Sequence, residues 1–191
     1  MGSEMCIRDR SELAKRRISS EDQYPKFRDF RTSSIMWDSS DGIFEGEALP
    51  LEISRGCPFA CSFCDYRKKG FGEAIKDPTS LKNELIRNYE LFGTTHYMIT
   101  DFLVNEDLEK MRMLHKLFTA LPFKMEWSGF GRLDLLKAYP EMFDLIIESG
   151  AKSVMWGIES IRKDAGRMIG KNCDIDVIED LLRKGRSEWG N

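Results

Sequence analysis

The chain has 191 residues, of which 41% are hydrophobic and 32% are charged. This composition is typical of a globular protein and excludes an intrinsically disordered chain. The 29 basic and 32 acidic side chains leave a net charge of −3, so no global electrostatic field favours nucleic acid or an anionic membrane as a partner.

No apolar run approaches the length of a membrane-spanning helix, and Met1–Arg10 lacks the apolar centre of a signal peptide. We therefore expect a cytoplasmic protein with no membrane and no nucleic-acid partner. Five cysteines in such a chain, three of them clustered, indicate metal or redox chemistry rather than a disulfide framework. Cys6 and Cys173 stand alone, and we interpret both as non-ligands.

The chain divides into three stretches by composition. Residues 1–10 are excluded from fold reasoning, because Met5–Arg10 resembles a translated sequencing-adapter sequence and would otherwise be a disordered tail. Residues 11–47 are polar with scattered aromatic side chains and predict an irregular lead-in. The regular pattern of a core domain occupies residues 48–191.

Three cysteines dominate the start of this core. Leu49–Ser54 predicts a short apolar strand, and it leads into Cys57, Cys61 and Cys64, spaced C-x-x-x-C-x-x-C. Three thiolates so close together suit a soft metal or an iron–sulfur cluster, and three ligands leave one iron of a four-iron cluster without a protein ligand. Zinc normally takes four ligands, and the nearest further candidate is His96. Three buried thiols without chemistry would not explain the clustering.

Strands and helices are expected to alternate after the cysteines. Asp77 and Pro78 begin a helix that Gly93 ends, and Asn105 is expected to cap the next helix, which Pro122 stops. One further helical segment is expected between Arg132 and Gly150, and others through Ile169 and from Asp176 to Arg183. The four strands are expected at Leu49–Ser54, His96–Thr100, Lys124–Phe130 and Ser153–Ile158.

This alternation predicts an α/β fold with parallel strands, which is a piece of about four β/α units from a barrel or an open sheet. Chemistry in this class gathers where the strands end. The cysteine loop, Asp101, Arg132 and Glu159 each follow one of the four strands, so we expect them to share a rim. Each charged residue taken alone could equally be a solvated cap at a strand end.

Four strands cannot close a barrel, and the last would be left as an uncovered edge. We therefore expect the chain to be a fragment truncated at its C-terminus, a partial (β/α) barrel that is inactive on its own.

The segment Arg55–Cys64, RGCPFACSFC, resembles the signature of the radical S-adenosylmethionine (radical SAM) superfamily, whose cysteine loop follows the first strand of a partial barrel. The Arg-Gly lead-in and Phe63 are similar to the branch whose members often carry a cobalamin-binding domain N-terminal to this core. Trp156–Ser160 resembles the Gly-x-Glu-Ser segment of the fourth strand there. The resemblance covers roughly residues 49–183.

The resemblance implies that Cys57, Cys61 and Cys64 bind a 4Fe-4S cluster whose fourth iron takes the amino and carboxylate groups of S-adenosyl-L-methionine. Reductive cleavage would then give methionine and a 5′-deoxyadenosyl radical that abstracts hydrogen from an unknown substrate. A small electron donor such as ferredoxin or flavodoxin would supply the electron, and cobalamin would belong to a domain outside this chain.

The resemblance also implies roles for four further residues. Phe63 would lie near the adenine, and Asp101 would hold the methionyl amine, although Thr100–Leu103 lacks the Gly-Gly-Glu of many members. Arg132 would pair with the methionyl carboxylate and Glu159 with the ribose hydroxyls. Packing for Phe63, and a salt bridge or cap for the other three, remain alternatives.

Two rival functions stay open at this point. An iron–sulfur electron carrier or sensor would usually supply a fourth cysteine, and Cys173 lies far along the chain. A zinc-binding scaffold would contain zinc and no iron. Methylation, cyclisation, thiomethylation and hydrogen abstraction without group transfer are all compatible with the sequence.

Overall fold

The computed structural model describes residues 30–65, 74–171 and 175–189. Residues 31–191 form one compact unit, distinct from a first unit of residues 1–30, and the fold described below is that of the longer unit. Cys6, Cys173 and the stretch 1–10, on which predictions were made, lie outside the described residues.

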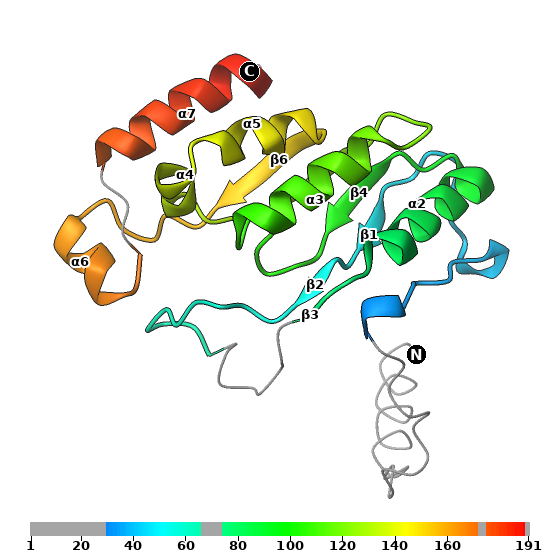
Figure 1. The fold of residues 1–191 in the computed structure, drawn as a ribbon, viewed down its shortest axis with the longest axis horizontal. Coiled ribbons are helices and arrows are strands. Elements are labelled where there is room, and N and C mark those ends of the chain that lie inside the picture. Colours follow the sequence, from blue (N-terminus) through cyan, green and yellow to red (C-terminus); the bar gives the residue numbers. More distant parts are fainter. Residues whose placement is uncertain (1–29, 66–73, 172–174, 190–191) are drawn as a thin grey trace, which may run out of the picture. The chain divides into compact units, whose positions relative to one another are not determined.

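The core is a four-stranded parallel sheet in the order β1-β4-β5-β6 (Figure 1). Each strand therefore lies beside the one that follows it in this sheet, as successive β/α units require. A separate antiparallel pair, β2 (Ser54–Arg55) and β3 (Ala74–Ile75), brackets the cysteine loop. The strands of the main sheet are β1 (Leu49–Leu51), β4 (His96–Ile99), β5 (Glu126–Gly131) and β6 (Ala151–Trp156).

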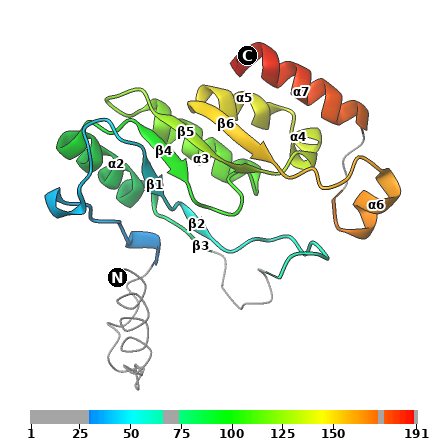
Figure 2. The same cartoon turned by 180° about the vertical axis from the view of Figure 1, so that it is seen from behind.

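Helices join the strands and cover one face of the sheet. Figures 1 and 2 show the sheet from its two sides, with α2, α3 and α5 together on one of them. The helices are α2 (Pro78–Phe92), α3 (Leu108–Thr119), α4 (Asp134–Ala138), α5 (Glu141–Glu148), α6 (Lys163–Met168) and α7 (Ile175–Trp189), preceded by the short 3-10 helices η2 (Phe30–Thr32) and η3 (Ser39–Asp41).

The expected α/β fold with four parallel β/α units is confirmed, and several local predictions need correction. The predicted first strand, Leu49–Ser54, is divided into β1 and β2. The predicted helix between Arg132 and Gly150 is two helices, α4 and α5, because Pro140 interrupts it. The prediction that Asn105 caps α3 is wrong: the side chain of Asp107 accepts a hydrogen bond from the Lys110 amide at 2.8 Å.

The start and end of α2 follow the sequence prediction. The side chain of Asp77 accepts a hydrogen bond from the Ser80 amide at 2.9 Å, and Pro78 occupies the first turn, where its missing N–H has no cost. Gly93 ends the helix in the left-handed conformation, with a φ of 63°. These local signals lie within a few residues of the helix ends, which is why they can be read from the sequence.

The buried core lies between the sheet and the helices. Alternate residues of β1 and β4 point into it, so the strands present one face to α2 and α3. Burial of this apolar surface is the main favourable term in folding. The core contains Leu49, Leu51, Ile53, Leu81, Leu85, Tyr97, Ile99, Met111, Leu114, Trp127, Phe143 and Ile146, among others.

The opposite face of the sheet is not covered by any helix in the part of the chain that the structure describes. Pro50, Met98, Ser128 and Ser153 lie side by side on this face in one row of the register. Met98, Phe130 and Met155 have 47%, 38% and 66% of their surface exposed. The carboxyl ends of the strands at one edge of this face carry the site described next.

No helix among the described residues is long and apolar enough to cross a membrane.

Candidate active site

A pocket of about 440 Å³ lies at the carboxyl ends of the strands. Parallel strands end at the same edge of a sheet, so loops far apart in sequence meet there. Six of the seven predicted site residues line it: Cys57, Cys61, Cys64, Phe63, Arg132 and Glu159. The remaining walls are Phe59, Phe102, Leu103, Phe130, Gly131, Met155, Trp156, Gly157, Ile158 and Lys171.

The three cysteines are free thiols along one wall of this pocket. Cys57 and Cys61 are half-buried and Cys64 is exposed. Burial raises the pKa of the Cys57 thiol, a backbone hydrogen bond at Phe59 opposes this rise, and the nearby Glu106 carboxylate adds to it. Metal binding must therefore drive off the Cys57 proton. Among residues 30–65, 74–171 and 175–189, no three Cys, His, Asp or Glu side chains are grouped to hold a metal ion.

The cysteine loop is attached to the segment that follows α6. The Ser62 amide donates a hydrogen bond to the Ile169 carbonyl at 3.2 Å, and the Cys64 amide donates to the Cys61 carbonyl at 3.1 Å. Gly170 has a φ of 79°, and a Cβ there would lie 3.4 Å from the Cys61 Cα. The loop and the post-α6 segment are therefore packed backbone against backbone.

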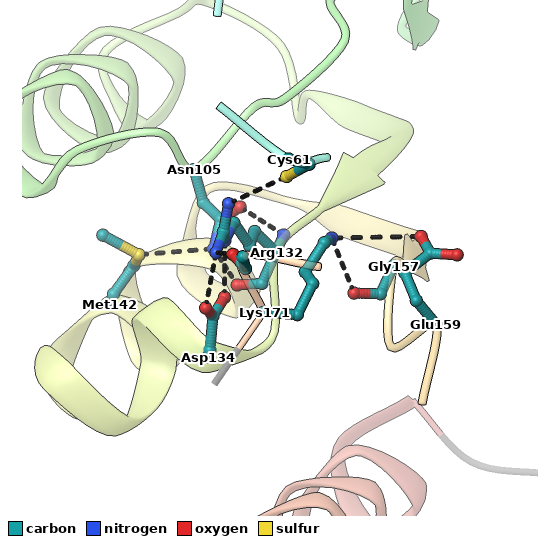
Figure 3. A network of polar contacts seen from close by, with 9 residues as sticks. Cys61, Asn105, Arg132, Asp134, Met142, Gly157, Glu159 and Lys171 are labelled. Carbon is teal, nitrogen blue, oxygen red and sulfur yellow. Dashed lines mark hydrogen bonds and ion pairs between the residues drawn. The ribbon is translucent and has the colours of Figure 1, made fainter. Parts of the chain in front are cut away.

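Arg132 connects the cysteine loop to the end of β5 (Figure 3). Its Nε and Nη2 donate to the two carboxylate oxygens of Asp134 at 2.7 and 2.8 Å, and Nη1 lies 3.5 Å from the Cys61 Sγ. Nη2 also donates to the Gly170 carbonyl, and the guanidinium lies 3.9 Å from the centre of the Phe59 ring. Planar, multiple hydrogen bonding of this kind is specific to arginine.

The charge of Arg132 is secured by these neighbours. Burial alone would lower the pKa of its guanidinium, but the hydrogen bonds and negative charge of Asp134 and the Cys61 sulfur outweigh it and raise the pKa. The backbone is fixed as well, since Asn105 accepts from the Arg132 amide at 2.8 Å and donates to its carbonyl at 3.0 Å. A permanent cation thus faces a sulfur in the pocket.

Glu159 and Lys171 also line the pocket, and the Lys171 side chain extends toward Gly157 and Glu159 (Figure 3). Among the described residues other than glycine, Glu159 alone has a positive φ, 61°. Such backbone strain is found most often at functional sites. The Lys171 Nζ donates to the Gly157 carbonyl at 2.9 Å and lies 3.9 Å from Glu159 Oε1.

Asp101 reaches the rim but faces the interior. Its oxygens accept from the Ile53 amide at 2.8 Å, the Ser54 hydroxyl at 2.7 Å and Lys110 Nζ at 3.0 Å, and the side chain has no exposed surface. Lys110 also contacts Glu106 at 3.2 Å. In this structure the carboxylate joins β2, the post-β4 loop and α3, and contact with a methionyl amine stays a prediction.

The site contains groups that the sequence reasoning did not select. Asp134, Gly157 and Lys171 take part in the polar contacts, and Phe59 stacks under Arg132. Asp134 could have been selected from the sequence, because it follows Arg132 by two positions at the end of β5, a spacing that allows the two side chains to form an ion pair. The two histidines contact Glu126 and Glu148 and do not line the pocket.

Comparison with known protein families identifies the family of this chain. The family model described as "Radical SAM superfamily" matches residues 51–188. The chain belongs to the radical SAM superfamily.

Relatives of the chain with curated names or solved structures include methyltransferases. The chain is 24% identical over 161 residues, 76% of its length and 35% of the relative, to "Bacteriochlorophyllide d C-8(2)-methyltransferase" of Chlorobaculum tepidum. The radical S-adenosylmethionine methyltransferase TsrM from Kitasatospora setae, solved with cobalamin and a 4Fe-4S cluster, has a TM-score of 0.60 at 19% identity, over 75% of this chain and 29% of that one. OxsB, a cobalamin-dependent S-adenosylmethionine radical enzyme, has a TM-score of 0.59 at 19% identity, over 71% and 22%.

The chain therefore spans between about a fifth and about a third of the length of these proteins. At this identity the two solved structures support the fold.

Proposed function

We propose that this chain is the core of a radical SAM enzyme that binds a 4Fe-4S cluster through Cys57, Cys61 and Cys64 and cleaves S-adenosyl-L-methionine reductively. One observation carries the proposal. In a chain of this superfamily, the three free thiols line the same 440 Å³ pocket as a buried cation and a carboxylate, at the carboxyl ends of the strands.

The residues present fit such a cluster. Cys57, Cys61 and Cys64 lie on one loop and line the same pocket, so each could supply a thiolate to a different iron of the cluster. Arg132 faces the Cys61 sulfur and offsets part of the negative charge that thiolates would add. When bound and reduced, the cluster supplies one electron for cleavage of the sulfonium.

The chain's own side chains give the pocket next to the cysteines a largely apolar lining. Phe59, Phe102, Phe130, Trp156 and Ile158 contribute this apolar surface. Pockets that bind small molecules are typically lined in this way, with a few polar groups that orient the ligand. Phe63 and Glu159 remain the proposed contacts for the adenine and the ribose hydroxyls, because both line the pocket.

The rival functions make different predictions about composition and spectra. The full-length protein is reconstituted anaerobically with iron and sulfide, reduced with dithionite, and examined by electron paramagnetic resonance with and without S-adenosyl-L-methionine. We expect a cluster signal that changes on addition of S-adenosyl-L-methionine, together with release of 5′-deoxyadenosine. A cluster that ignores S-adenosyl-L-methionine would indicate an electron carrier or sensor, and zinc without iron would indicate a scaffold.

Cysteine variants give the matched control. Cys57→Ala, Cys61→Ala and Cys64→Ala are each expected to lose most of the bound iron, whereas Cys173→Ala is expected to retain it. Retention of iron and sulfide by all three of the first variants would contradict the ligand assignment.

We further propose methyl transfer as the reaction, supported by the methyltransferases among the relatives. Cobalamin, present in the TsrM structure, is the proposed methyl carrier and would bind outside this chain. A small donor such as ferredoxin or flavodoxin is the proposed source of electrons. Formation of S-adenosylhomocysteine by the full-length protein only when cobalamin is added would support methyl transfer; 5′-deoxyadenosine without S-adenosylhomocysteine would exclude it.

A further inference from the structure

The open face of the sheet, which carries Met98, Ser128, Phe130 and Met155, continues into the pocket. Phe130 and Met155 are register partners on β5 and β6, and both line the pocket that contains the three cysteines. Ser128 and Met98 are register partners one row earlier, and the Ser128 hydroxyl donates to the Met98 Sδ at 3.6 Å. Because alternate residues of a strand point to the same face, these side chains form one surface that leads to the cysteines.

The part of the open face nearest to the pocket is accessible and carries no charge. Met98, Phe130 and Met155 expose 47%, 38% and 66% of their surface, so a ligand can reach them. Phe102, in the loop after β4, is 60% exposed and lines the pocket as well. In the two rows that the structure describes here, every residue is apolar or a serine: Pro50, Met98, Ser128 and Ser153, followed by Phe130 and Met155.

Charged side chains of the open face lie at its other end, and they are paired with one another. Glu126, four residues before Phe130, contacts Lys152 Nζ at 2.9 Å and lies 3.9 Å from the Nδ1 of His96. The hydrogen bond from Lys152 lowers the pKa of Glu126, so this carboxylate stays ionised near neutral pH. About 13 Å of strand separates Glu126 from Phe130, at roughly 3.3 Å per residue. These charges therefore do not serve a group bound beside the cysteines.

The two basic side chains that line the pocket, Arg132 and Lys171, each have a carboxylate nearby. Arg132 donates to both oxygens of Asp134, at 2.7 and 2.8 Å. Lys171 donates to the Gly157 carbonyl at 2.9 Å and lies 3.9 Å from Glu159 Oε1. Since opposite charges already offset these cations, they attract a further anionic group only weakly.

We propose that the substrate places an uncharged apolar group, a ring or a hydrocarbon segment, on the open face against Met98, Phe130 and Met155. The proposal rests on the proposed function and deepens it by naming the class of substrate. Thioether side chains adapt to irregular surfaces and make favourable contacts with aromatic rings. A carboxylate, sulfonate or phosphate at the same place would lose hydration without gaining a partner of opposite charge. The open face thus selects for apolar groups and against anions beside the cysteines.

Two dyes with the same ring system test this preference. N-phenyl-1-naphthylamine is uncharged, and 8-anilino-1-naphthalenesulfonate differs from it by one sulfonate. Dissociation constants are measured anaerobically by fluorescence titration, corrected for cluster absorption, on the reconstituted full-length protein with its cluster oxidised. S-adenosyl-L-methionine is present in excess, so that its part of the pocket is filled and no cleavage occurs. We expect the uncharged dye to bind at least about tenfold more tightly than the sulfonate.

Variants at exposed methionines locate the dye. Met155→Glu and Met98→Glu each place a carboxylate on the open face, and each is expected to weaken binding of the uncharged dye about tenfold or more. Met155→Leu keeps the surface apolar and is expected to stay within about threefold of the wild type. Met36→Glu is the matched control, because Met36 is 65% exposed and does not line this pocket, and it is expected to change nothing.

The outcomes that overturn the proposal are specific. Equal or tighter binding of the sulfonate by the wild type would reject an apolar substrate group, and this comparison needs no variant. An affinity for the uncharged dye that is the same in Met155→Glu, Met98→Glu and Met36→Glu would mean that another segment or a second copy covers the open face.

Failure of the proposed function gives a different result. A wild-type protein that takes up no cluster, or that holds a cluster but does not cleave S-adenosyl-L-methionine on reduction, would reject the radical SAM proposal itself. A protein that cleaves S-adenosyl-L-methionine but shows no preference for the uncharged dye would reject only the class of substrate.

Discussion

The Arg132 Nη1 lies 3.5 Å from the Cys61 Sγ, although the two residues are 71 positions apart in the chain. The contact joins the cysteine loop after β2 to the end of β5, and Asp134 on the other side of the guanidinium keeps it oriented. A fixed positive charge beside a cysteine that we propose as a cluster ligand has an electrochemical consequence, because charge and hydrogen bonds at the sulfurs tune cluster potentials.

Arg132→Gln is therefore expected to lower the reduction potential of the bound cluster. The reduced cluster carries one more negative charge, so removing the cation disfavours it, by on the order of 60 mV for each tenfold change in the one-electron equilibrium. The measurement is a redox titration of the reconstituted full-length protein followed by electron paramagnetic resonance. Arg112→Gln, an exposed arginine on α3, is the control. An unchanged potential in Arg132→Gln would show that the guanidinium has no electronic influence on the cluster.

The fold and the cysteine loop could be predicted because their signals are local. The helix-starting Asp77 and Pro78 and the closing Gly93 act within one turn of the helix ends, and the spacing of the three cysteines is itself the motif. Strand alternation then placed four polar loops at one rim, since parallel strands end together. The structure has six of the seven selected residues in one pocket.

The contacts of Asp101 and Lys171 depend on the direction in which each side chain points. The position of a residue at the end of a strand does not determine that direction. Asp101 turns inward because Lys110, from α3, and the Ile53 amide, directly before β2, meet there. Lys171 enters the pocket because the segment after α6 packs on the cysteine loop. In the sequence, Cys61 of that loop precedes Lys171 by 110 residues. These contacts arise from tertiary packing, which single-sequence periodicity does not report.

The buried ion-pair network beneath the loop makes Lys110 a sensitive position. Its ammonium, with no exposed surface, contacts Ser54 Oγ at 2.7 Å, Asp101 at 3.0 Å and Glu106 at 3.2 Å. Lys110→Met would leave two carboxylates without their cation, and we expect a loss of about 3–5 kcal/mol in the free energy of unfolding. Urea denaturation measures it, with Lys116→Met on the same helix as the exposed control. A loss no greater than that of the control would mean that the network is not energetically coupled.

The same network predicts a pH dependence through Glu106. Burial raises the pKa of this carboxyl; Lys110 opposes the shift, and Asp101 and Asp107 add to it. Because the pKa of Glu106 is higher in the folded than in the unfolded state, folding favours the protonated carboxyl. This contribution to the free energy of unfolding is fully present below the unfolded pKa, about 4.3. It is lost as the pH rises through the pKa of the folded state. Glu106→Gln removes this loss, so its stability relative to the wild type should increase as the pH rises above about 4.3.

The measurement is urea denaturation of wild type and variant at a series of pH values from about 4 to 7, the range that brackets the unfolded pKa and neutral pH. Glu109→Gln, on the exposed face of α3, controls for removal of one carboxylate. A stability difference between Glu106→Gln and wild type that falls with rising pH would reverse the sign and show that Lys110 dominates over burial.

A substitution at Phe63 can test ligand binding without a large effect on stability, because Phe63 lines the pocket while 55% of its surface is exposed. An exposed aromatic side chain contributes little to folding, so Phe63→Ala should change the free energy of unfolding by no more than about 0.5 kcal/mol. If Phe63 stacks on the adenine as proposed, the variant should bind S-adenosyl-L-methionine more weakly by a factor of roughly 5 to 150, by analogy with the 1–3 kcal/mol of base stacking on aromatic side chains.

Phe44→Ala is the matched control, because Phe44 is 77% exposed and does not line this pocket. Equilibrium dialysis with S-adenosyl-L-methionine and with free methionine on the reconstituted full-length protein distinguishes the ligand parts. We expect Phe63→Ala to weaken binding of the first and leave binding of the second unchanged, since methionine has no adenine. Weakened binding of both would instead indicate that Phe63 supports the cysteine loop, and unchanged binding of both would remove Phe63 from the site.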